Sequence, residues 1–156
     1  FATLDTSSRR MRFPNEKEVI FVDTVGFIRE LPKELIAAFK STLEEVGEAD
    51  ILIHLVDASN SEYKKQIQVV NNTLDSLGFN DKPRVLVFSK TDLLSEIEVQ
   101  GLLNTNDAYV ISAVQRKGLE ELILCLQETL HQTFKGQDPG RFTEIESLPD
   151  VNFENE

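Results

Sequence analysis

Apolar residues along the chain follow two alternating spacings, which predicts strands and helices in turn. Short apolar runs at 19–22, 51–56, 85–88 and 108–111 predict strands, and an extended stretch at 9–13 precedes the turn at 14–15. Between these runs, apolar residues recur every three or four positions, which is typical of amphipathic helices. The first predicted helix follows Pro32 and ends before Gly47, and the second is capped by residues 59–61 and ends before Gly78. A third covers 96–103, and a fourth begins at Leu119.

This order of elements predicts an α/β fold with a mostly parallel sheet. The runs at 19–22 and 51–56 contain almost no polar residue, which is typical of strands buried on both faces. Each run ends in polar residues, and in such sheets the ligand lies beyond the carboxyl ends of the strands. The ends to compare are therefore Asp23, Asp57, Ser89-Lys90-Thr91-Asp92 and Ser112-Ala113.

The composition limits the class of protein. The chain has 156 residues, of which 40% are apolar and 28% charged, as expected for one globular domain. A net charge of −11 disfavours binding to nucleic acid by charge alone, and we expect no DNA partner. No apolar run is long enough for a membrane span, and the single cysteine, Cys125, excludes an internal disulfide. We expect a cytoplasmic protein.

The segment Asp23-Thr24-Val25-Gly26 opens a loop after a buried strand. An acid at a strand end can hold the water shell of Mg²⁺, and a glycine three residues later lets a backbone N–H approach a terminal phosphate. The alternative is an ordinary strand end with a turn glycine. Taken alone, this segment does not decide between the two.

Two further strand ends carry groups that could bind a purine. Asp92 can accept two hydrogen bonds from guanine, which adenine cannot donate, and the aliphatic stem of Lys90 can cover a base face. Backbone amides at Ser112-Ala113 could reach a purine carbonyl oxygen. Each segment alone fits a solvated loop equally well, but their order, each after an apolar strand, favours a nucleotide site.

In that order the motifs resemble those of a translation-factor-class GTPase. More narrowly, the chain resembles the HflX family over residues 1–134. The resemblance rests on Phe1-Ala2-Thr3-Leu4-Asp5 with Arg9-Arg10, on Asp23-Thr24-Val25-Gly26-Phe27-Ile28 with Leu31-Pro32, and on Val56-Asp57-Ala58-Ser59.

The resemblance implies a Ras-like three-layer α/β/α G domain that binds GTP or GDP with Mg²⁺, hydrolyses GTP slowly and associates with the large ribosomal subunit. Thr3 would bind Mg²⁺ directly, and Asp23 would bind it through water. The other residues implied to bind nucleotide are Phe1, Ala2, Leu4, Asp5, Thr24, Val25, Gly26, Ser89, Lys90, Thr91, Asp92, Ser112 and Ala113. No catalytic residue is assigned, since Phe27 stands where many GTPases have a water-orienting Gln.

The chain contains no G-x-x-x-x-G-K-[ST] phosphate loop. We therefore expect residues 1–134 to be the C-terminal portion of a G domain, from the first switch onward. The first strand, the phosphate loop and the first helix would precede Phe1, and the first strand would lie between the strands ending at Asp23 and Asp57. We expect residues 135–156 to form a flexible acidic tail.

Two other classes of function stay open. A phospho-receiver-like signalling module would use Asp57 as the phosphate acceptor, with Ser89 and Lys90 at the next strand. A nucleotide-free interaction domain would keep the fold without the ligand. Guanine-selective binding would distinguish a GTPase from both of these classes.

Overall fold

A computed structural model describes residues 7–13, 18–24, 46–105 and 107–135 of the chain. All of the predicted acidic tail except Lys135 lies outside these residues, as does most of the predicted helix after Pro32. The last residue of that helix, Val46, begins a helical stretch over 46–48. The described elements alternate strand and helix from residue 52 onward, as the sequence predicts.

The first two strands form a hairpin. Strand β1 (Ser7–Arg12) pairs antiparallel with β2 (Glu18–Asp23), so that Ser7 lies opposite Asp23. An exposed ion pair of 3.6 Å joins Arg10 on β1 to Glu18 on β2. The hairpin therefore ends with Asp23 at the tip of its second strand.

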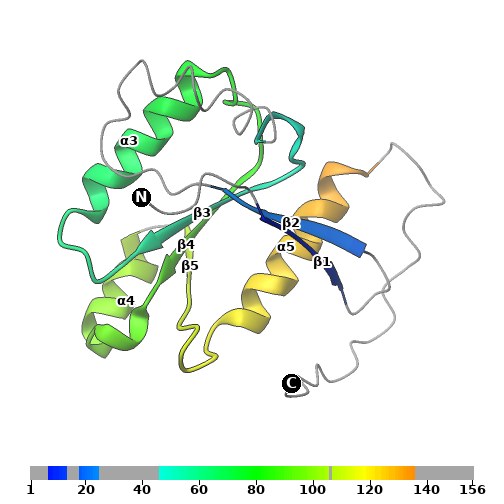
Figure 1. Cartoon of the computed structure of the whole chain (residues 1–156). Helices are drawn as coiled ribbons and strands as arrows, with labels where there is room; N and C mark the ends of the chain where they lie inside the picture. The colour runs from blue at the N-terminus through cyan, green and yellow to red at the C-terminus, as the bar shows by residue number, and fades with distance from the viewer. Residues whose placement is uncertain (1–6, 14–17, 25–45, 106, 136–156) are drawn as a thin grey trace.

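A second sheet contains three parallel strands in the order β3-β4-β5, with the bounds Leu52–Asp57, Arg84–Ser89 and Ala108–Val110. Parallel strands need a crossover, which here contains a helix in each case. Helix α3 (Tyr63–Ser76) connects β3 to β4. The 3₁₀ turn η1 (Thr91–Leu93) and helix α4 (Glu96–Thr105) connect β4 to β5, and α5 (Leu119–Thr133) follows. The carboxyl ends of β3 and β4 lie at one edge of this sheet (Figure 1).

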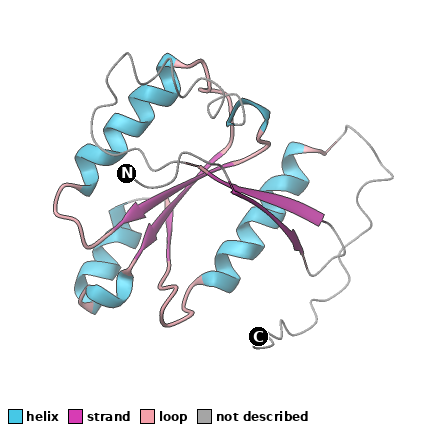
Figure 2. Cartoon of the chain, viewed as in Figure 1, coloured by secondary structure: helices cyan, strands magenta, loops and turns pink. Residues whose placement is uncertain are grey.

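Alternate residues of β4 divide the core into two layers. Val85 and Val87 point to one side, where Leu126 of α5 and Phe13 beside the hairpin pack against them. Phe88 points to the other side and belongs to a second cluster with residues of β3 and α4. Helices thus cover both faces of the parallel sheet, with α5 and the hairpin together and α3 and α4 together (Figures 1 and 2).

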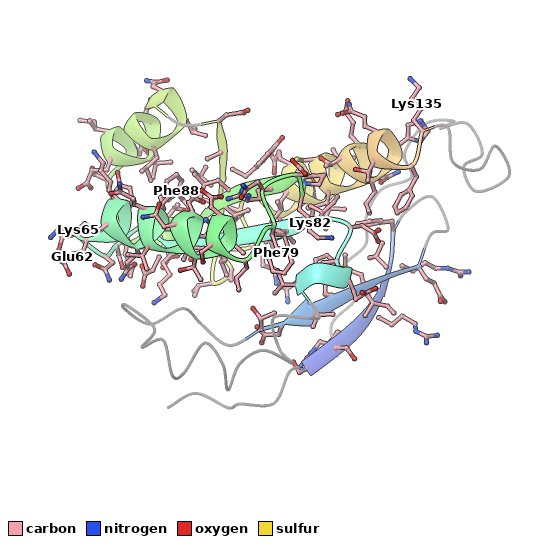
Figure 3. The ribbon with its side chains drawn as sticks, turned by 90° about the horizontal axis from the view of Figure 1, so that it is seen from above. Glu62, Lys65, Phe79, Lys82, Phe88 and Lys135 are labelled. Atoms are coloured by element: carbon pink, nitrogen blue, oxygen red, sulfur yellow. The ribbon has the colours of Figure 1, made fainter. Side chains whose placement is uncertain are left out.

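The aromatic ring of Phe88 fixes the position of α3. Phe88 is fully buried, and its ring meets that of Tyr63, the first residue of α3, edge to face with centroids 5.5 Å apart. The side-chain view shows Phe88 beside α3, and Glu62 and Lys65 together near the start of that helix (Figure 3). Residues of β4 are therefore buried on both faces of the sheet.

The prediction that the first two apolar runs are buried on both faces is wrong for the described residues. Ile20 and Val22 on β2 are 64% and 42% exposed, and Ile53 and Leu55 on β3 are 37% and 60% exposed. Among the described strands, β2 pairs only with β1 and β3 only with β4. Each strand therefore has one edge without a strand partner in this part of the chain and one apolar face that is incompletely covered.

None of the helices in the described segments is long and apolar enough to cross a membrane.

Candidate functional site

The end of β4 is joined to the neighbouring strand β3 through Ser89, the last residue of β4. The hydroxyl of Ser89 donates to the carbonyl oxygen of Val56 on β3 over 3.0 Å, and the N–H of Ala58 donates to the Ser89 carbonyl over 3.1 Å. These bonds continue the β3–β4 register, in which Asp57 lies opposite Ser89. The serine at the first position of the predicted guanine motif thus fixes the start of the loop to β3.

The loop between β4 and η1 begins at Lys90. Its backbone is left-handed, with φ 58° and ψ 33°, a conformation that costs a residue with a Cβ roughly 1–2 kcal/mol. Its Nζ lies 2.6 Å from Oδ2 of Asp57 at the end of β3. The hydrogen bonds from Lys90 and then Ser59 lower the pKa of Asp57, so the carboxylate of this pair stays charged at neutral pH.

Thr91 joins the same loop to the strand on the other side. Its hydroxyl and its backbone N–H both donate to the carbonyl oxygen of Ile111, over 2.9 and 3.3 Å. The Ile111 N–H in turn donates to the carbonyl of Phe88 over 2.8 Å. The loops after β4 and β5 are therefore held side by side.

A hydrogen bond between side chains completes this connection. The hydroxyl of Ser112 donates to Oδ1 of Asp92 over 2.6 Å and accepts the N–H of Gln115 over 3.1 Å. Ser112 is almost fully buried, and its backbone exchanges two hydrogen bonds with Lys117. Ala113, next to it, is exposed.

This arrangement leaves both carboxylate oxygens of Asp92 able to accept a hydrogen bond from a ligand, since each oxygen has two lone pairs. Within the described part of the chain, Oδ2 of Asp92 accepts no hydrogen bond, whereas Oδ1 accepts the bond from Ser112. A half-buried carboxylate with a fixed orientation suits the paired N–H groups of guanine, and charge-assisted bonds of this kind are strong. The geometry thus brings together Ser89, Lys90, Thr91, Asp92 and Ser112, with Ala113 beside them, as the sequence predicts.

The residues predicted for the phosphate side are only partly described. Asp23 and Thr24 stand at the exposed end of β2, which belongs to the hairpin and not to the parallel sheet. Phe1, Ala2, Thr3, Leu4, Asp5, Val25 and Gly26 lie outside the described residues. The roles of Asp23 and Thr24 therefore stay predictions. Within the described segments, no three His, Cys, Asp or Glu side chains gather as a metal site.

Two contacts of the site were not predicted from the sequence. The sequence indicates Asp57 as a polar strand end and as a possible phosphate acceptor, but its ion pair with Lys90 depends on the β3–β4 register. The bonds from Thr91 to Ile111 likewise depend on where the loop after β4 meets the next strand. A polar residue directly after each of two neighbouring strands is the signal that could have indicated the first.

The fold and the arrangement of these loops are those of a GTPase domain. A family model described as 50S ribosome-binding GTPase matches residues 1–90, and the chain belongs to this family. Among its relatives are proteins named GTPase HflX: one from Caldanaerobacter subterraneus subsp. tengcongensis is 46% identical over 130 residues, and one from Escherichia coli is 37% identical over 133 residues. Each alignment covers 83% of this chain, but only 29% and 31% of the relative. The chain thus spans about a third of the length of these relatives.

Solved structures show the same fold. A crystal structure of SsGBP with GDP superposes with a TM-score of 0.64 and 28% identity, over 81% of this chain and 43% of that one. Era in complex with MgGDPNP and a segment of 16S ribosomal RNA superposes with a TM-score of 0.67, over 81% of this chain and 45% of that one. Era is 22% identical, so its likeness supports the fold alone. The Ras-like α/β fold predicted from the sequence is confirmed.

Proposed function

We propose that this chain is the guanine-reading portion of an HflX-type GTPase, a protein that binds GTP and GDP and hydrolyses GTP. The observation that carries the proposal is the hydrogen bond from Ser112 to Asp92, which orients a carboxylate where the loops after β4 and β5 meet. The family match and the HflX relatives support it, and so does the GDP complex of SsGBP.

The phosphate side of the site completes this proposal. Thr3 and Asp23 would hold Mg²⁺, the threonine directly and the aspartate through water, and Gly26 would meet the terminal phosphate. Carboxylate and hydroxyl oxygens are ligands that Mg²⁺ prefers, so the residue types fit the ion. When bound, Mg²⁺ would neutralise charge on the phosphates. Since these two residues are too few for a full set of ligands, the remaining ones would come from water, from the phosphates and from residues outside this chain.

We further propose that the missing parts of the site belong to sequence preceding Phe1. The chain contains no phosphate-loop motif, and β2 and β3 each have one edge without a strand partner among the described strands. A strand between β2 and β3, followed by a phosphate loop and a helix, would supply both. Residues 1–134 would then form one G domain together with this preceding segment, and residues 135–156 would be its acidic tail.

Slow hydrolysis in the cytoplasm on the large ribosomal subunit is the proposed biological setting. Phenylalanine at position 27 cannot orient a water molecule, so we expect a low intrinsic rate that a partner raises. The family description names 50S ribosome binding. With a net charge of −11, this chain is a poor candidate for the main RNA-contacting surface, which other parts of the protein would have to supply.

The test uses the complete protein that carries this chain and compares GDP, ADP and xanthosine diphosphate by competition against fluorescent GDP. We expect GDP to bind at least about a hundredfold more tightly than ADP, because adenine leaves the carboxylate of Asp92 unpaired. Asp92→Asn should weaken GDP about a hundredfold and improve xanthosine diphosphate, because the amide N–H₂ suits the additional carbonyl of xanthine.

Two outcomes would contradict the proposal. If the complete protein binds no guanine nucleotide, a nucleotide-free interaction domain is the better description. If acetyl phosphate labels Asp57 while GDP fails to bind, the phospho-receiver reading is the better one.

A further inference from the structure

The ion pair between Asp57 and Lys90 connects two loops that are 33 residues apart in the chain. Asp57 is the last residue of β3, and Lys90 directly follows β4. The two strands are parallel with Asp57 opposite Ser89, so the register alone brings both side chains to the same edge of the sheet. The distance from Nζ to Oδ2 is 2.6 Å, the shortest of the four ion pairs in the described segments.

The carboxylate of Asp57 is itself held in one orientation. Its Oδ1 accepts the backbone N–H of Ser59 over 3.0 Å and the Ser59 hydroxyl over 2.6 Å. The Asp57 carbonyl accepts the N–H of Asn60 over 3.2 Å, which closes the turn after β3. With Oδ1 engaged by Ser59, Oδ2 is directed to Lys90. Asp57 is thus a fixed point and not a mobile counterion.

Lys90 is fixed at both ends of its side chain. Its backbone is left-handed, with flanking bonds from Ser89 to Val56 and from Thr91 to Ile111. Its ammonium group is held by Asp57. The four-carbon stem between these two points therefore cannot sample the full set of lysine rotamers, and it lies two residues before Asp92 on the same short loop.

We propose that Asp57 is a positioning residue for guanine binding, which holds the Lys90 ammonium so that the lysine stem is ordered before the base arrives. This inference rests on the proposed function, in which Asp92 reads the base edge. A long flexible side chain that packs against a ligand loses rotamer freedom on binding, and this loss weakens affinity. The Asp57 contact removes that loss in advance, so it contributes to affinity without touching the nucleotide.

A stabilising role alone would give a different result. The side chains of Asp57 and Lys90 are 34% and 58% exposed, and ion pairs at such sites contribute little to folding. We therefore expect Asp57→Asn to leave the thermal unfolding temperature of the complete protein nearly unchanged. The effect should appear in nucleotide affinity.

The experiment is a double-mutant cycle with Asp57→Asn, Lys90→Met and both together, using the complete protein and fluorescent GDP. Asparagine keeps the size of the side chain and an oxygen for Ser59, but it removes the charge that holds Lys90. We expect Asp57→Asn to weaken GDP and inosine diphosphate about tenfold alike, because the stem packs on the base face and does not read the 2-amino group. In the Lys90→Met background, Asp57→Asn should have no further effect.

The matched control is Asp75→Asn. Asp75 forms an ion pair of 3.2 Å with Arg84 at the opposite end of β4, so the same substitution removes a charge of the same kind away from the site. It should leave GDP affinity unchanged. High salt should also reduce the difference between Asp57→Asn and the unaltered protein, because it screens an exposed pair.

Three outcomes overturn the inference, and one moves the test to a second variant. If Asp57→Asn weakens GDP equally with and without Lys90, Asp57 acts by another route. If Asp57→Asn binds GDP normally, the pair has no positioning role, although the proposed function stands. If Asp57→Asn fails to fold, Ser59→Ala replaces it, since loss of the Ser59 hydroxyl should give a smaller effect in the same direction, and normal GDP binding there would count against the inference. If the unaltered protein binds no guanine nucleotide, both proposals fail.

Discussion

Ser112 donates a 2.6 Å hydrogen bond to Asp92, and the two residues lie 20 positions apart on loops that follow neighbouring strands. Ser112 is 1% exposed, so water cannot replace this bond. The same hydroxyl accepts the N–H of Gln115. One small side chain therefore holds both the orientation of Asp92 and the turn that follows β5.

Ser112→Ala should affect stability and nucleotide affinity together. The change removes the donor to Asp92 and the acceptor for Gln115, and each unmade bond at a buried position costs about 1–3 kcal/mol. We expect a loss of roughly 2 kcal/mol in the free energy of unfolding and about a tenfold loss of GDP affinity. Chemical denaturation and fluorescent GDP binding on the complete protein would measure the two.

The control for this substitution is Ser76→Ala. The Ser76 hydroxyl donates to the Thr73 carbonyl over 2.7 Å, but it is exposed at the end of α3, so water can take its place. Ser76→Ala should lower the free energy of unfolding by less than about 0.5 kcal/mol. Equal destabilisation by both substitutions would show that burial of Ser112 is not what makes its bond valuable.

Gly118 stands at the start of α5 with φ 72°, and Gly78 follows α3 with φ 81°. Both φ values favour glycine, but the two surroundings differ. A Cβ on Gly118 would overlap the backbone oxygen of Val110, whereas one on Gly78 would meet nothing within 4 Å. Comparing alanine substitutions at these two glycines therefore distinguishes the cost of backbone strain from the cost of a steric clash.

Gly78→Ala should cost only the strain of a left-handed residue, about 1–2 kcal/mol. Gly118→Ala should cost clearly more, about 3 kcal/mol or above, because the end of β5 must move away and Ser112 with it. Thermal unfolding of both variants gives the comparison, and reduced GDP affinity should accompany Gly118→Ala alone. Similar unfolding temperatures would mean that β5 moves without cost.

The sequence predicts which residues reach the site better than it predicts how they are held there. Polar residues at the ends of β4 and β5 could be placed from the apolar runs, because parallel strands bring their carboxyl ends to one edge. The contact between Asp57 and Lys90 could not, because it requires the register of two strands whose residues are 33 apart. Spacing along a strand indicates its faces but not its partner's register.

Two local differences have similar causes. The sequence predicts that residues 59–61 cap α3, but the cap residue is Glu62 and no side chain forms a capping bond there. The Ser59 side chain is engaged by Asp57, and the side chain of Asn60 accepts the N–H of Glu62, so neither side chain bonds an N–H of the helix. The exposed faces of β2 and β3 differ from the prediction because burial depends on which neighbours cover them, which an apolar run does not reveal.

His54 on β3 predicts a dependence of stability on pH. It is half-buried, and burial and then the charge of Arg84 lower its pKa below the usual 6.5. The folded state therefore binds this proton less readily than the unfolded state does. The stability contributed by neutral His54 is complete above about pH 6.5 and is lost as the pH falls from there toward the folded pKa, with a slope of at most about 1.4 kcal/mol per pH unit.

His54→Gln tests this directly, because glutamine is polar and of similar size but does not titrate. We expect the unaltered protein to lose more of its free energy of unfolding between pH 7.5 and pH 5.5 than the variant does. Urea denaturation of the complete protein at the two pH values measures the difference. Parallel losses in both proteins would place the acid sensitivity in other groups.

Leu55 tests whether another segment covers the open side of β3. It is 60% exposed, and its neighbour on the same face, Ile53, is 37% exposed. If sequence preceding Phe1 packs there, Leu55→Lys should destabilise the complete protein by about 2–3 kcal/mol, because a charge would be buried in an apolar contact.

In the 156 residues alone, Leu55→Lys should reduce self-association of the chain, since it places a charge on an exposed apolar patch beside an open strand edge. Ile97→Lys on α4, at a position 85% exposed, is the control and should be neutral in the complete protein. A neutral Leu55→Lys in the complete protein would show that this face of β3 stays open to solvent, and the proposed strand, phosphate loop and helix would then need another place in the fold.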